Sequence, residues 1–192
     1  MMNQNLKRAR ELAGYFNQKL KEDGIVPTVK RTGAFVKRRF FGKKGRFLPT
    51  KKALAAQRAA DTQDWPVISV CVPLYNTPKL YFDQLLASVQ NQTCPRWLLC
   101  LADASDEAHA GVGQWARQAA EKDSRIRYKK IENKGISANT NQAAELADGE
   151  YLALADHDDL LAPHAIYWAS RTAKETGAGF LYSDEALFSR DI

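Results

Sequence analysis

The sequence predicts an α/β domain with a mostly parallel sheet flanked by helices and preceded by a basic helical arm. From Val67 onward, short apolar runs alternate with stretches whose apolar residues recur every three or four positions. This alternation is typical of βαβ units. The fourth apolar run, Tyr151–Ala155, leads directly into the acidic stretch Asp156–Asp159, D-H-D-D. Acids at the end of a parallel strand lie where open α/β sheets bind their ligands.

The charge of the chain is divided unevenly. Residues 1–60 contain 16 of the 28 Lys and Arg residues but only 3 of the 22 Asp and Glu residues. Composition changes again near Trp65, where the apolar runs begin. We therefore divide the chain into a basic helical arm with a connector, residues 1–64, and an α/β domain, residues 65–192, and we read residues 53–64 as the connector.

The arm combines an amphipathic helical pattern with basic residues and interleaved phenylalanines between residues 28 and 47. This composition suits an anionic membrane surface, where aromatic rings enter the interface and cations meet the headgroups. Packing of the arm on the domain or on a partner chain is an equal alternative. Nucleic acid is a weaker one, because no motif of that kind is present. We predict that residues 1–50 bind anionic membranes reversibly.

Several classes of protein are excluded by what the sequence lacks. No run is long enough to span a membrane, and the N-terminus has no apolar core of a secretory signal. The three cysteines show no zinc-binding spacing and are expected to be free thiols. We therefore expect a cytoplasmic protein that is at most peripheral to the inner face of the plasma membrane.

Nine elements are predicted in the α/β domain from the spacing of apolar residues. The Tyr151 strand is continuously apolar, so it is expected to be buried on both faces. The predicted strands are Val67–Val72, Trp97–Ala102, Ile126–Ile131, Tyr151–Ala155 and Gly179–Tyr182, and the predicted helices are Tyr81–Gln92, one around Val112–Ala119, Ile136–Ala147 and Pro163–Lys174.

Polar residues follow each strand, and a parallel sheet brings such residues to one edge. Tyr75 is suited to stacking on a base, and Asp103 to accepting an N–H from a pyrimidine ring. Gly135 allows close approach of the backbone, while Lys134 and a helix N-terminus near Ser137 favour a phosphate. The candidate binding residues at these strand ends are Pro73, Tyr75, Asn76, Asp103, Lys134, Gly135, Ser137 and Asp156.

Two carboxylates in the acidic stretch, Asp156 and Asp158, are spaced for a divalent cation. Mg²⁺ and Mn²⁺ prefer oxygen ligands, and they also bind phosphate. The alternative is that the acids only cap the following helix, for which one acid is sufficient. From the residues alone, the two interpretations are equally supported.

Several linked motifs between residues 66 and 185 resemble the family-2 glycosyltransferases: P-V-I-S-V-C-V-P-L-Y-N-T-P, W-L-L-C-L-A-D-A-S, E-N-K-G-I-S-A-N-T-N-Q-A, D-G-E-Y-L-A-L-A-D-H-D-D-L-L-A-P and Y-S-D-E. The resemblance implies the GT-A fold and a nucleotide-diphosphate-sugar donor, with D-H-D-D as the DxD motif. It also implies a sugar or lipid-linked saccharide acceptor and a role in bacterial surface polysaccharide synthesis.

The resemblance assigns roles to individual residues. Pro73, Tyr75 and Asp103 would line the nucleoside pocket. Asp156 would face the ribose or phosphate, and Asp158 would bind Mn²⁺ or Mg²⁺ on the diphosphate. Asn141 matches the asparagine of the family's helix after the third strand and would position the preceding loop.

Three departures from the family pattern affect these expectations. A-D-A-S has one acid where two are common, and Asn139 replaces a small apolar residue. The chain ends soon after the predicted fifth strand, so the part of the domain that carries the acceptor side and the catalytic base has no counterpart. Asp184 and Glu185 are the remaining candidates for that base. We therefore expect slow transfer, exposed apolar surface, or a partner chain that completes the domain.

Two other functions remain open at this stage. One is a binding or scaffolding module that binds the donor without turnover. The other is a sugar-nucleotidyltransferase, which would carry a glycine-rich basic loop after the first strand, where this chain has Leu74–Thr77.

Overall fold

The computed structural model describes residues 49–183. The basic arm and its predicted membrane contact lie outside this range, as do Asp184 and Glu185. The membrane contact and the two acids therefore stay predictions. No helix in the described range is long and apolar enough to cross a membrane.

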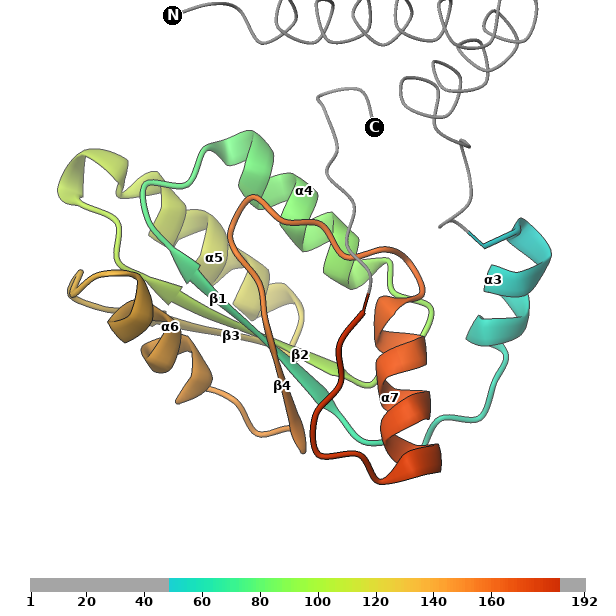
Figure 1. The fold of residues 1–192 in the computed structure, drawn as a ribbon. Helices are drawn as coiled ribbons and strands as arrows, with labels where there is room; N and C mark the ends of the chain where they lie inside the picture. The colour runs from blue at the N-terminus through green and yellow to red at the C-terminus, as the bar shows by residue number, and fades with distance from the viewer. Residues whose placement is uncertain (1–48, 184–192) are drawn as a thin grey trace, which may run out of the picture. The chain divides into compact units, whose positions relative to one another are not determined.

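Four parallel strands form the centre of the domain (Figure 1). Their order across the sheet is β3-β2-β1-β4, with β1 paired to both β2 and β4. The parallel α/β sheet predicted from the sequence is thus confirmed. The strands are β1 Ile68–Leu74, β2 Trp97–Asp103, β3 Ile126–Lys130 and β4 Tyr151–Leu154.

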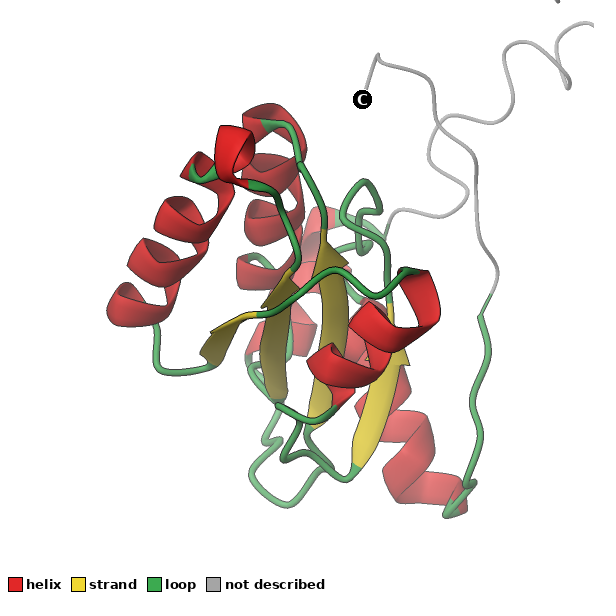
Figure 2. Cartoon of the chain, turned by 90° about the vertical axis from the view of Figure 1, so that its left-hand side faces the viewer, coloured by secondary structure: helices red, strands yellow, loops and turns green. Residues whose placement is uncertain are grey.

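Helices cover both faces of the sheet, as Figure 2 shows from the side. Residues of α4, α5 and α7 pack on one face in the larger apolar core, whereas Ala143 of α6 packs on the other. The helices are α3 Lys51–Arg58, α4 Lys79–Gln90, α5 Gly111–Lys122, α6 Ile136–Ala144 and α7 Ala165–Thr176.

Alternation along β1 and β2 divides their side chains between the two faces. Leu99 and Leu101 of β2 enter the larger core. Cys100 lies on the face that α6 covers, beside Cys71, its partner in β1. Both thiols are fully buried and free, as the sequence predicted. Contact with the Cys71 thiol, followed by burial, raises the pKa of Cys100.

The expectation for the burial of β4 is wrong. Leu152 and Leu154 are 55% and 69% exposed, although Tyr151 and Ala153 pack against the larger core. Leu152 and Leu154 share the face of Ser69 and Cys71, where α6 covers β1 and β2. Within residues 49–183, no element extends this cover over β4, so one face of the strand meets solvent.

Two element predictions are also wrong. The predicted strand Gly179–Tyr182 does not form, and Phe180 and Tyr182 are 82% and 92% exposed. Helix α3, residues 51–58, includes the first part of the segment 53–64 that was predicted to be a connector. Its N-cap Thr50 accepts a hydrogen bond from the Ala53 N–H at 3.2 Å. This cap satisfies a free N–H of the first turn.

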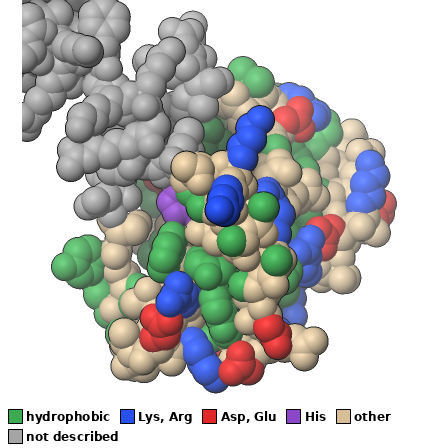
Figure 3. All heavy atoms as spheres, turned by 90° about the vertical axis from the view of Figure 1, so that its right-hand side faces the viewer, with side chains coloured by type: hydrophobic (Ala, Val, Ile, Leu, Met, Phe, Trp, Pro, Cys, Tyr) green, Lys and Arg blue, Asp and Glu red, His purple; other side chains and the backbone are tan. Residues whose placement is uncertain are grey.

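Helices α3 and α7 lie on the side of the molecule shown in Figure 3, where hydrophobic side chains lie between charged ones. Trp168 of α7 is 48% exposed there. An ion pair of 2.8 Å between Lys174 and Asp64 joins α7 to the segment after α3.

Candidate functional site

The loops after β1 and β2 are joined at the carboxyl edge of the sheet. The backbone N–H of Asn76 donates to Ser105 Oγ at 2.9 Å. Its side-chain amide donates to Asp106 Oδ2 at 2.9 Å and accepts from the Asp106 N–H at 3.1 Å. Asn76 has a φ of 49°, a left-handed conformation that asparagine tolerates better than most residues. These bonds fix the turn that carries Tyr75, whose ring is 46% exposed.

Asp106 is also paired with His109, whose Nδ1 lies 2.6 Å from Asp106 Oδ1. The hydrogen bond with His109, and then that with Asn76, lowers the pKa of Asp106 below its ordinary value. The carboxylate therefore stays ionised at neutral pH and keeps the two loops linked. His109 thus holds Asp106 from within the loop after β2.

Asp103 points into the protein. It is 1% exposed and lies on the same sheet face as Leu101. Its carboxylate accepts hydrogen bonds from the Ser105 N–H at 2.9 Å, from Lys130 Nζ at 3.1 Å and from the Tyr128 hydroxyl at 3.3 Å. Asp103 therefore anchors the loop after β2, and its contact with a base stays a prediction.

Gly113 of α5 makes room for this buried carboxylate. A Cβ at this position would lie 2.6 Å from the Tyr128 hydroxyl oxygen and 2.9 Å from Asp103 Oδ2. Burial, followed by the charge of Asp103, raises the pKa of Tyr128, so the phenol remains a hydrogen-bond donor.

The loop after β3 is held by Asn139. Its side chain accepts from the Lys134 N–H at 3.1 Å and donates to Asn133 Oδ1 at 3.0 Å, and it is 4% exposed. Asn141, which was expected to position this loop, is exposed. Asn139, which the sequence showed only as a departure from the family pattern, makes these loop contacts, and the role of Asn141 stays a prediction.

The predicted phosphate contacts lie at the start of α6. Gly135 has a φ of 89° and is the N-cap of the helix, a conformation that glycine adopts readily. Lys134 and Ser137 are exposed on either side of it. The loop therefore presents backbone and side-chain donors to solvent.

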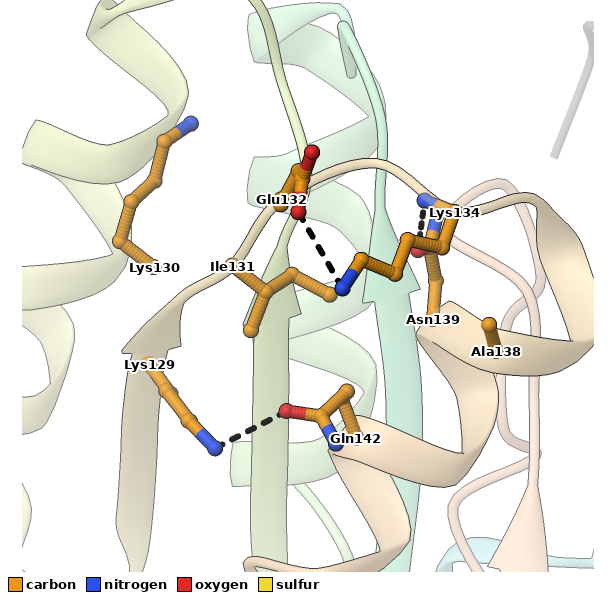
Figure 4. Close-up of a pocket in the computed structure, with 8 residues that line it drawn as sticks. All are labelled: Lys129, Lys130, Ile131, Glu132, Lys134, Ala138, Asn139 and Gln142. Atoms are coloured by element: carbon orange, nitrogen blue, oxygen red, sulfur yellow. Dashed lines mark hydrogen bonds and ion pairs between the residues drawn. The ribbon is translucent and has the colours of Figure 1, made fainter.

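A pocket of about 250 Å³ lies between the end of β3 and the start of α6 (Figure 4). Its lysines already have partners: Lys134 Nζ lies 3.2 Å from Glu132, and Lys129 Nζ lies 2.9 Å from Gln142 Oε1. Lys134 is the candidate binding residue common to this pocket and the predicted site. Neither Tyr75 nor the acidic turn contributes to its lining.

The acidic residues after β4 form a turn with two free carboxylates. Asp159 Oδ2 accepts from the Asp156 N–H at 3.0 Å, and the Asp159 N–H donates to the Asp156 carbonyl at 3.1 Å. Asp156 and Asp158 are exposed, and within residues 49–183 neither side chain has an ion pair.

The helix-cap alternative for these acids does not hold for α7. The N-cap of α7 is His164, whose side chain makes no capping hydrogen bond to the helix. In the described part of the chain, no three His, Cys, Asp or Glu side chains converge as a metal cluster. Two exposed carboxylates fit a hard cation that takes its other ligands from phosphate and water. Asp156 and Asp158 are thus suited to hold Mn²⁺ or Mg²⁺ together with a diphosphate.

His164 leads to a prediction about pH. Its Nδ1 is buried without a partner among the described residues, and burial lowers its pKa from 6.5. The folded state then binds fewer protons than the unfolded state, so this contribution to stability is complete above pH 6.5 and is lost as the pH falls through the lowered pKa. The urea midpoint is expected to fall on acidification from pH 8 to pH 5.5, and less so for His164→Gln. His157→Gln is the control, and an unchanged pH dependence in His164→Gln would contradict the prediction.

Comparison with known proteins places the chain in a family. The sequence profile described as "Glycosyl transferase family 2" matches residues 69–183. The chain is 38% identical over 125 residues to the uncharacterized protein y4gI of Sinorhizobium fredii, covering 64% of this chain and 14% of that protein. It is 29% identical over 140 residues to the O-antigen biosynthesis protein RfbC of Myxococcus xanthus, covering 71% of this chain and 11% of that protein.

Among solved structures, S. aureus TarS 1-349 in complex with UDP-GlcNAc is 22% identical, with a TM-score of 0.49 over 58% of this chain and 32% of that one. The chain thus spans only a small part of these proteins. The matched profile covers the sheet and all four loops at its carboxyl edge. The chain belongs to glycosyl transferase family 2.

Proposed function

We propose that this domain is the donor-binding part of a glycosyltransferase that acts in bacterial surface polysaccharide synthesis. The observation that carries the proposal is the pair of exposed carboxylates, Asp156 and Asp158, at the carboxyl end of a central parallel sheet. Membership of the family and the similarity to an O-antigen biosynthesis protein support the donor class and the process.

The donor is a nucleotide-diphosphate sugar. Tyr75, which is exposed, would stack on the base, and the Asn76–Asp106 link holds the turn that carries it. The exposed N-terminus of α6, with Gly135 and Lys134, is suited to negative charge. Pro73 lies in β1 close to this edge, and Asp103 anchors the loop after β2 from beneath.

Transfer requires an acceptor hydroxyl that attacks the anomeric carbon while the bond from that carbon to the diphosphate oxygen breaks. A base removes the proton from the hydroxyl, which typically contributes about 100- to 10,000-fold in rate. A bound Mn²⁺ or Mg²⁺ would supply neutralisation of the leaving diphosphate. Asp156 and Asp158 would hold that cation, and the base, for which Asp184 and Glu185 are candidates, lies outside the described residues.

Calorimetry tests the proposal directly. UDP, CDP, GDP and ADP are titrated into the full 192-residue chain with Mn²⁺ and with EDTA. At least one nucleoside diphosphate is expected to bind more tightly with Mn²⁺, because the cation removes the repulsion between the carboxylates and the diphosphate. The absence of metal-linked binding for all four would contradict the proposal. If the chain binds a nucleoside diphosphate but does not release it from the corresponding sugar donor, the result would favour the alternative, a binding or scaffolding module without turnover.

A further inference from the structure

The segment that follows the acidic turn is attached to the C-terminal end of α4. The Leu161 N–H donates to Ser88 Oγ at 3.2 Å. The next two residues offer their carbonyls: that of Ala162 accepts from Gln92 Nε2 at 2.8 Å, and that of Pro163 accepts from the Thr93 N–H at 2.8 Å. Within the described chain, residues 155–166 make only two other hydrogen bonds to distant residues, from the Ala155 N–H to the Cys71 carbonyl and from the Ile166 N–H to Gln92 Oε1. Leu161 and Ile166 also pack in the larger core.

Gln92 is the central member of this attachment. It lies two residues beyond α4 and is 8% exposed. Its Nε2 donates to the Ala162 carbonyl and also to the Ser88 carbonyl at 3.0 Å, while its Oε1 accepts from the Ile166 N–H at 3.0 Å. Both donors and the acceptor of the amide are therefore used, as a buried amide requires.

The Ile166 N–H is one of the free donors of the first turn of α7. Since α7 has no side-chain cap of its own, Gln92 supplies the cap from 74 positions away in the sequence. One amide thus holds both the chain entering α7 and the first turn of that helix. A glutamate could accept from Ile166 but could not donate to Ala162, and an asparagine is one methylene shorter.

We propose that Gln92 is a positioning residue for the metal-binding turn Asp156–Asp159. The turn is held on one side by β4, through its ladder with β1, and on the other side by Gln92 only a few residues after Asp159. Because carboxylates bind a cation well only in a narrow geometry, an unattached turn would bind it less tightly. This inference rests on the proposed function, in which Asp156 and Asp158 hold the cation.

The test compares Gln92→Met with Gln90→Met in the full chain. Methionine has a similar volume but makes none of the three hydrogen bonds of Gln92. Gln90 is the last residue of α4, two positions before Gln92, and is exposed, so its replacement is a matched control. Loss of an outer residue that orients metal ligands typically costs about 10- to 100-fold in metal affinity. The readout is the Mn²⁺ concentration at which the increase in nucleoside diphosphate binding is half complete. This concentration is expected to rise by at least about tenfold in Gln92→Met and to stay unchanged in Gln90→Met. Binding without metal should be unchanged in both variants.

Amide hydrogen exchange of residues 156–166 is measured on the same proteins without ligand. Faster exchange in this segment is expected for Gln92→Met and not for Gln90→Met. If Gln92→Met does not fold, two other variants replace it. Gln92→Glu keeps the acceptor, and Ser88→Ala removes the bond from Leu161 together with the bond that the Ser88 hydroxyl donates to the Leu85 carbonyl. An intermediate shift in Mn²⁺ requirement is expected for each.

The outcomes separate the two proposals. A wild-type chain without any Mn²⁺-linked binding would overturn the proposed function, and hydrogen exchange would still decide whether Gln92 holds the turn. A folded Gln92→Met protein with the wild-type Mn²⁺ requirement, or with unchanged exchange over residues 156–166, would overturn the positioning role.

Discussion

Replacing Asp158 by alanine is expected to abolish the Mn²⁺ dependence of nucleoside diphosphate binding. The Asp158 side chain is exposed, and no ion pair within residues 49–183 competes for it. With a single carboxylate left, Asp156 alone would hold the cation on the diphosphate weakly. The dissociation constant in Mn²⁺ should then equal that in EDTA, as measured by calorimetry.

The fold should tolerate this change, because the hydrogen bonds of the turn use Asp156 and Asp159 instead. Asp83→Ala is the matched control, since Asp83 is an exposed aspartate on α4 that pairs with Lys79. It should keep the full Mn²⁺ effect. An equal enhancement by Mn²⁺ in Asp158→Ala and wild type would assign the metal, or the diphosphate, to other residues.

Leu101→Ala is expected to lower the free energy of unfolding by about 2–5 kcal/mol. Leu101 is fully buried in β2 and belongs to the larger core between the sheet and helices α4, α5 and α7. Truncation removes its apolar contacts and leaves a cavity, and a typical domain is stable by only about 5–15 kcal/mol. Urea unfolding followed by circular dichroism measures the change.

Leu152→Ala is the control for this prediction because it makes the same truncation on the exposed face of β4. It should change the free energy of unfolding by no more than about 0.5 kcal/mol. A loss comparable to that of Leu101→Ala would show that the β4 face is covered in solution, as a completing partner chain would cover it.

Strands β1 to β4 and the helices after each were predictable because their apolar residues repeat with a clear period. Burial of β4 was not, because an apolar run does not reveal whether a neighbouring element covers it. Gly179–Tyr182 has strand composition, yet a strand also needs a hydrogen-bonded neighbour, and the described chain supplies none. Helix α3 was missed because its eight residues are too few to show a clear helical period, although Thr50 was a readable cap signal.

The location of the candidate site was predictable because parallel strands end at one edge. The inward direction of Asp103 was not, since it depends on Tyr128 and Lys130 of another strand. The same holds for Gln92, whose bonds reach residues 70 and 74 positions away. The spacing of apolar residues predicts helices and strands because it is a local property of the sequence. These contacts form between residues that are distant in sequence, so local spacing does not predict them.

The two edges of the sheet differ in a way that bears on self-assembly. An unpaired strand edge can accept a strand from another molecule, and charged residues oppose this. The outer strand β3 contains Arg127, Lys129 and Lys130 within five residues, whereas β4, Y-L-A-L, contains no charge. Among residues 49–183, charge therefore opposes strand addition at β3 but not at β4. Two copies that paired through β4 would use up both of these permissive edges, which favours a closed dimer over a growing fibre.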